Sequence, residues 1–68
     1  MEIKDKLLLI RAKLNLSQEA LARELNVSYA TINRWETGRT NPSQRYIMLI
    51  NNYIKEKGIQ TNDQNENI

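Results

Sequence analysis

The sequence predicts an all-α fold built from four helical segments. Apolar residues recur at spacings of three and four in separate stretches, and capping residues divide those stretches from one another. No stretch alternates between apolar and polar residues over the length of a strand. At 68 residues, of which 40% are hydrophobic, the chain can form one small domain with a modest core. Two-domain and barrel architectures are therefore excluded.

The first two helices are indicated by an apolar stripe and by the residues that flank it. We expect the first helix over residues 2–14, where one face carries Ile3, Leu7, Ile10 and Leu14. Asn15 interrupts this pattern. Ser17 is then suited to accept a hydrogen bond from the first turn of a second helix over residues 18–25. Asn26 can adopt the left-handed conformation that ends a helix abruptly, so a sharp turn is expected there.

Two further helices follow from the same kind of signal. Ser28 is positioned to cap a third helix that runs to about Thr37, and Gly38 offers the left-handed conformation that follows a helix end. A proline then prevents continuation. Ser43 is expected to cap the last helix, over residues 44–57, which ends at a second glycine. Each expected boundary carries residues that favour it.

The expected domain covers residues 1–58, and a disordered polar tail is expected over residues 59–68. The tail is rich in Asn, Gln and acidic residues and buries too little apolar surface to offset its chain entropy. All ten Lys and Arg lie in residues 1–57 together with six of the eight acids, so this part carries +4 although the whole chain carries +2. A basic excess of this size weakly favours an anionic partner such as nucleic acid.

The composition argues against catalysis and metal binding. Cys and His are absent, which removes disulfides, thiolate nucleophiles, imidazole bases and nearly every structural zinc site. No glycine-rich phosphate loop and no nucleophile beside a base occur, so we expect no enzyme activity, no cofactor and no metal. No apolar run reaches the roughly 18 residues of a membrane span, and the N-terminus lacks the apolar segment of a signal peptide. We therefore expect a cytoplasmic protein without membrane contact.

The centre of the chain has the parts of a helix-turn-helix unit, namely a short helix, a tight turn and a second helix. Within it, the run L-S-Q-E-A-L-A from residue 16, the run V-S-x-x-T-I-x-x-W-E-x-G from residue 27, and the proline before the last helix closely resemble the Cro/Xre-type, lambda-repressor-like family of DNA-binding domains. The resemblance covers residues 5–57. It implies a compact four- to five-helix bundle with a central helix-turn-helix whose third helix enters the major groove of double-stranded DNA.

The third helix separates into two faces because successive side chains are rotated by about 100°. If Ile32 and Trp35 point into the core, the opposite face lacks large aliphatic residues. That face holds the expected base-reading residues, which are Tyr29, Ala30, Asn33 and Arg34. Arginine can donate two hydrogen bonds to guanine, asparagine can pair with adenine, and alanine or tyrosine can contact a thymine methyl. From the residues alone an ordinary solvated helix face is the alternative, and the resemblance favours DNA.

The resemblance also implies backbone contacts and one ion pair. In the family, the glutamine that opens the second helix contacts phosphate, and Gln18 matches it. The expected DNA-backbone contacts lie at the two helix starts and around the loop after the third helix: Ser17, Gln18, Ser28, Thr31, Thr37, Arg39 and Asn41. Arg45 either extends this set or is an ordinary solvated side chain. A structural ion pair is implied between Arg11 and Glu36, which would hold the third helix against the first.

Two functions of different classes fit these observations. The leading hypothesis is a sequence-specific regulator of transcription, most simply a nucleoid-associated repressor of bacterial or phage type that occludes a promoter. The alternative is an antitoxin-like or accessory subunit that uses the same fold to bind another protein. A candidate dimer face on the last helix consists of Tyr46, Leu49 and Tyr53, and it would serve a homodimer, at least on DNA, or a protein partner. Because a monomer with few phosphate contacts binds weakly at physiological salt, we expect two copies to pair.

Overall fold

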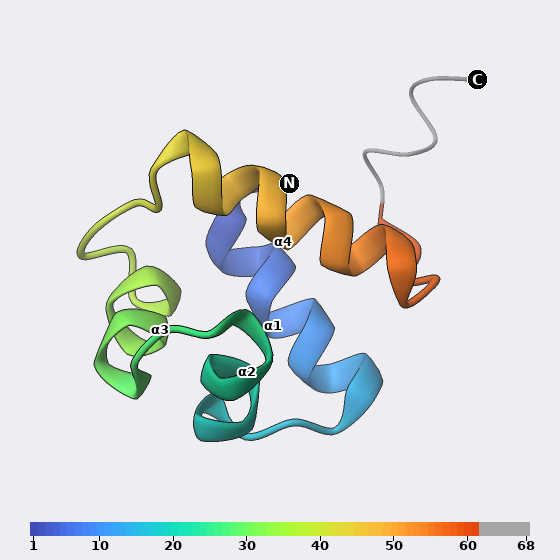
Figure 1. Ribbon diagram of the computed structural model, residues 1–68, viewed down its shortest axis with the longest axis horizontal. Coiled ribbons are helices and arrows are strands. Elements are labelled where there is room, and N and C mark those ends of the chain that lie inside the picture. The colour runs from blue at the N-terminus through green and yellow to red at the C-terminus, as the bar shows by residue number, and fades with distance from the viewer. Residues whose placement is uncertain (62–68) are drawn as a thin grey trace.

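The computed structural model describes residues 1–61 and is all-α over that range (Figure 1). Its four helices are α1 (Ile3–Leu14), α2 (Gln18–Leu25), α3 (Tyr29–Glu36) and α4 (Gln44–Glu56). α1 packs against both α3 and α4, and α2 packs against α3. Figure 1 shows α4 crossing one side of α1, with the pair α2 and α3 on the other side. The predicted fold class is confirmed.

The helix boundaries follow from local capping chemistry. The Ser17 hydroxyl accepts a hydrogen bond from the Ala20 N–H at 3.0 Å, and the Ser28 hydroxyl accepts one from the Thr31 N–H at 3.1 Å. Asn26 ends α2 in the left-handed conformation, with φ at 59°. Ser43 occupies the N-cap position of α4, but its side chain makes no capping hydrogen bond. The prediction that Ser43 stands at the N-cap of the last helix is therefore confirmed, and its backbone conformation alone marks the helix start.

The core lies where the helices meet and draws on every one of them. Its fully buried side chains are Leu7, Ile10, Leu21, Ile32 and Ile50. Trp35 and Tyr46 extend this core, with their ring centroids 5.5 Å apart. Outside the core, the Lys6 ammonium donates to the Asn51 side-chain oxygen at 2.8 Å and links α1 to α4. α3 has one buried side, which contains Ile32 and Trp35, and one exposed side.

The packed part of the chain continues beyond α4. Ile59 is 5% exposed and belongs to the hydrophobic core, and Thr61 is also buried. The prediction of a domain over residues 1–58 with a tail from residue 59 is corrected at this point, because the left-handed turn at Gly58 brings Ile59 back onto the core. Residues 62–68 of the predicted tail lie outside the described residues.

Candidate nucleic-acid interface

The two predicted faces of α3 are present in the structure. Ile32 and Trp35 are buried, whereas Tyr29, Ala30 and Arg34 are exposed and Asn33 is half-buried. The four expected base-reading residues line one open hollow of the surface together with Arg39 and Thr40. The helix and the loop after it therefore form a single surface that carries two guanidinium groups. Thr40 lies in the loop that was expected to contact the DNA backbone, although it was not among the residues named for that contact.

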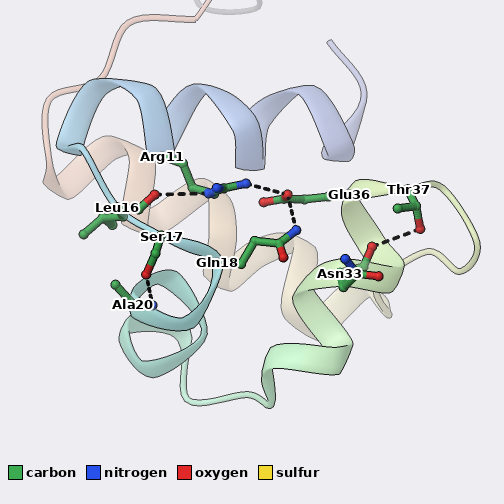
Figure 2. Close-up of polar contacts among 8 residues, drawn as sticks. All are labelled: Arg11, Leu16, Ser17, Gln18, Ala20, Asn33, Glu36 and Thr37. Atoms are coloured by element: carbon green, nitrogen blue, oxygen red, sulfur yellow. Dashed lines mark hydrogen bonds and ion pairs between the residues drawn. The ribbon is translucent and has the colours of Figure 1, made fainter.

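The residues expected at the DNA backbone lie at the start of α2, at the start of α3 and in the loop after α3. Most of them are exposed, while Gln18 and Thr31 are half-buried. Thr31 is held within its own helix, because its hydroxyl lies 2.8 Å from the Ser28 hydroxyl and accepts a long 3.5 Å contact from Arg34. The Thr37 hydroxyl donates to the Asn33 carbonyl at 2.9 Å (Figure 2). Since a hydroxyl has one proton, Thr37 would have to exchange this bond to donate to a phosphate.

Arg11 and Glu36 form an ion pair across 25 residues of sequence. An Arg11 guanidinium nitrogen lies 2.8 Å from the Glu36 Oε1 atom, and the Arg11 Nε–H donates to the Leu16 carbonyl at 3.1 Å (Figure 2). The Glu36 side chain is 5% exposed and the Arg11 side chain 28% exposed. The pair that the resemblance implied therefore joins α1, the loop after it and the end of α3.

A second donor to the same carboxylate was not foreseen. The Gln18 side-chain amide donates to Glu36 Oε1 at 2.8 Å, so this oxygen accepts from both α1 and α2 (Figure 2). The other carboxylate oxygen, Oε2, is buried and has no hydrogen-bond partner among the described residues. No local sequence signal indicates a contact between Gln18 and Glu36, because it depends on how α2 and α3 pack.

Only part of the expected dimer face lies at the surface. Tyr53 is 9% exposed, and its hydroxyl donates to a Glu24 carboxylate oxygen at 2.8 Å, so it joins α4 to α2 and is not available at the surface. Burial, together with the hydrogen bond and negative charge of Glu24, raises the pKa of Tyr53 to about 12. Tyr46 is half-buried against Trp35. Leu49 is exposed as predicted.

A groove between α2 and α4 contains what is left of this face. Met48 and Leu49 are its exposed apolar residues, and Glu24 and Arg45 add one charge of each sign. The Arg45 guanidinium lies 5.8 Å from the centre of the Tyr46 ring. Arg45 therefore lines this groove and not the hollow on α3, which argues against the expectation that it extends the backbone contacts.

The fold and the exposed helix define a helix-turn-helix domain of the DNA-binding class. Residues 7–59 match the family described as helix-turn-helix, and the chain belongs to this Cro/C1-type family of transcription regulators. Proteins of this family are generally not enzymes. The HTH-type transcriptional activator BcrR of Enterococcus faecalis is 38% identical over 54 residues, which is 79% of this chain and 26% of the relative.

The chain thus spans about a quarter of the length of this curated relative. No solved structure gives a significant match. Among the described helices, none is long and apolar enough to cross a membrane.

Proposed function

We propose that this protein regulates transcription by binding double-stranded DNA at specific sequences, with α3 in the major groove. The observation that carries the proposal is the hollow on α3, where Tyr29, Asn33 and Arg34 meet the loop residue Arg39 on a surface with no role in the core. An arginine on an exposed helix face can offer a planar pair of donors to guanine, and the adjacent asparagine amide suits adenine.

The remaining contacts position the protein and do not read sequence. Gln18 at the start of α2 is suited to a phosphate oxygen, because the helix dipole adds positive charge at that end. Arg39 and Asn41, both exposed in the loop after α3, would hold the backbone on the other side of the reading helix. Phosphate contacts of this kind fix register and orientation, whereas the α3 face supplies discrimination.

A single copy carries few cations for the DNA backbone, so the proposal includes a homodimer on DNA. The groove between α2 and α4 is compatible with a two-fold arrangement, because it holds both Glu24 and Arg45, and Glu24 of one copy can face Arg45 of the other. Met48 and Leu49 supply apolar surface there. The same groove is the observation that favours the second candidate function, an accessory subunit that binds another protein. Sedimentation with and without duplex DNA separates the two, since a homodimer assembles without any other protein.

We further propose that the protein represses the promoter that it occupies. A domain that occupies a promoter without contacting polymerase blocks transcription, which makes repression the simplest outcome. The relative described above is named an activator, so the same kind of domain also serves the opposite role in another protein. A reporter gene placed downstream of the selected site measures the sign directly.

Selection of binding sites from random duplexes tests the function. The parent should enrich one sequence, and Arg34→Ala should lose about 1 to 3 kcal/mol of binding free energy and its preference at one base pair. Lys55→Ala is the matched control, because it also removes one positive charge but lies near the end of α4 remote from α3 (Figure 1). If no sequence is enriched, or if Arg34→Ala binds like the Lys55 control, the proposal is refuted.

A further inference from the structure

Gln18 links two helices of the domain. It is the first residue of α2, where a phosphate is expected, and its side chain is bonded to Glu36, the last residue of α3. Figure 2 shows the Gln18 amide and the Arg11 guanidinium reaching the same Glu36 oxygen from different elements. The beginning of one helix and the end of the reading helix are therefore joined by one side chain.

The chemistry of the amide fits a bridging role. A carboxylate accepts hydrogen bonds and cannot donate them, so the amide nitrogen of Gln18, and not its oxygen, must face Glu36. That nitrogen carries two hydrogens, and the bond to Glu36 uses one of them. The second hydrogen remains suited to an anionic acceptor such as a phosphate oxygen.

Gln18 supplies one of the two hydrogen bonds that the Glu36 carboxylate accepts from side chains. Both of its side-chain hydrogen bonds end at Oε1, from Arg11 and from Gln18, while Oε2 is buried without a hydrogen-bond partner in the part of the chain that the structure describes. Loss of the Gln18 amide would leave a nearly buried carboxylate held by Arg11 alone. Since Glu36 is the last residue of α3, the bonds to its carboxylate hold this end of the helix against α1 and α2.

We propose that Gln18 is a positioning residue for sequence discrimination, which acts through Glu36 to align α3. This inference rests on the proposed function. It differs from a plain phosphate contact in a measurable way, because a phosphate contact strengthens binding to every sequence by the same factor. A residue that aligns the reading helix strengthens binding to the selected site more than binding to unrelated DNA.

The test compares two affinities for each variant, one for the selected duplex and one for an unrelated duplex of the same length. Gln18→Met keeps the length of the side chain and removes its donors. We expect it to lower the ratio of the two affinities by about tenfold, the effect of one hydrogen bond to a charged group. Asn41→Ala is the matched control, since it removes an exposed amide from the loop after α3 and should lower both affinities equally. Partial unfolding also lowers both affinities equally and leaves the ratio unchanged.

A second background separates action through Glu36 from an independent effect. In a Glu36→Met protein the side chain keeps its length but has no oxygen to accept from Gln18, so adding Gln18→Met should change the ratio by much less than in the parent. An unchanged ratio in the Gln18→Met protein would overturn the inference, and so would an equal fall in both backgrounds. A parent that does not discriminate between the two duplexes would overturn the proposed function and this inference with it. Discrimination by the parent that survives Gln18→Met would overturn the inference alone.

Discussion

Replacement of Glu36 by alanine is the substitution whose consequence the structure specifies most fully. It removes the acceptor of two hydrogen bonds, from Arg11 and from Gln18, and leaves the Arg11 guanidinium without its counter-charge. It also removes a side chain that is only 5% exposed from the contact between α1 and α3. Both effects destabilise the folded state, so the free energy of unfolding should fall.

The size of the fall lies between two known limits. Breaking a buried ion pair costs roughly 3 to 5 kcal/mol, whereas an exposed pair contributes about 0 to 1 kcal/mol. Here Glu36 is nearly buried, but Arg11 is 28% exposed and keeps its bond to the Leu16 carbonyl. We therefore expect a loss of about 2 to 3 kcal/mol. For a domain of this size, each 1 kcal/mol corresponds to a fall in Tm of roughly 4 to 8 °C.

Thermal and urea unfolding at neutral pH, followed by circular dichroism, measure this loss. Glu56→Ala is the control, because it removes an equal charge from an exposed position at the end of α4 and should change stability by less than about 0.5 kcal/mol. The double variant Arg11→Met, Glu36→Leu should recover much of the lost stability, since no unpaired charge remains. If Glu36→Ala and Glu56→Ala have the same free energy of unfolding, the ion pair does not stabilise the fold and the reasoning is refuted.

Ser17→Ala should cost about 1 kcal/mol of unfolding free energy and Ser43→Ala much less, because Ser17 accepts a capping hydrogen bond and Ser43 does not. Urea unfolding of the two variants side by side checks this. The free energy of unfolding should fall between pH 10 and about 12, where Tyr53 stays neutral in the folded state because its pKa is raised while the unfolded hydroxyl ionises. Tyr53→Phe should lessen this pH dependence in urea titrations, and an unchanged dependence would contradict it. A chain that ends at residue 58 should be less stable than one that ends at residue 61 by about 2 kcal/mol, the contribution of burying Ile59, and equal Tm values would refute this.

The helix boundaries could be predicted because their causes are local. A serine accepts from an N–H three residues ahead, and an asparagine takes a left-handed conformation through its own backbone, as Ser17 and Asn26 do. The division of α3 into a buried and an exposed face is equally local, since helical geometry relates Ile32 to Trp35 without reference to the rest of the chain.

The features that sequence analysis missed depend on packing between distant segments. Tyr53 looked like surface because it flanks the apolar stripe of α4, but α2 approaches closely enough for its hydroxyl to reach Glu24, 29 residues away. The bond from Gln18 to Glu36 spans 18 residues and has no periodic signal. Ile59 follows a glycine in a polar segment, so its burial depends on the direction in which the chain leaves α4. In each case the contact depends on how distant segments pack and not on the neighbouring residues in the sequence.

Under the proposed function, α3 separates recognition from folding within eight residues. Ile32 and Trp35 hold it in the core and Glu36 anchors its end, whereas Tyr29 and Arg34 are exposed and contribute little to stability. Substitutions at exposed positions usually change stability by less than about 0.5 kcal/mol, so the exposed residues that we propose to read DNA can change without loss of the fold. Arg34→Ala should therefore melt like the parent while it loses discrimination, whereas Glu36→Ala should lose stability and discrimination together. That contrast distinguishes a residue that reads DNA from one that holds the reading helix in place.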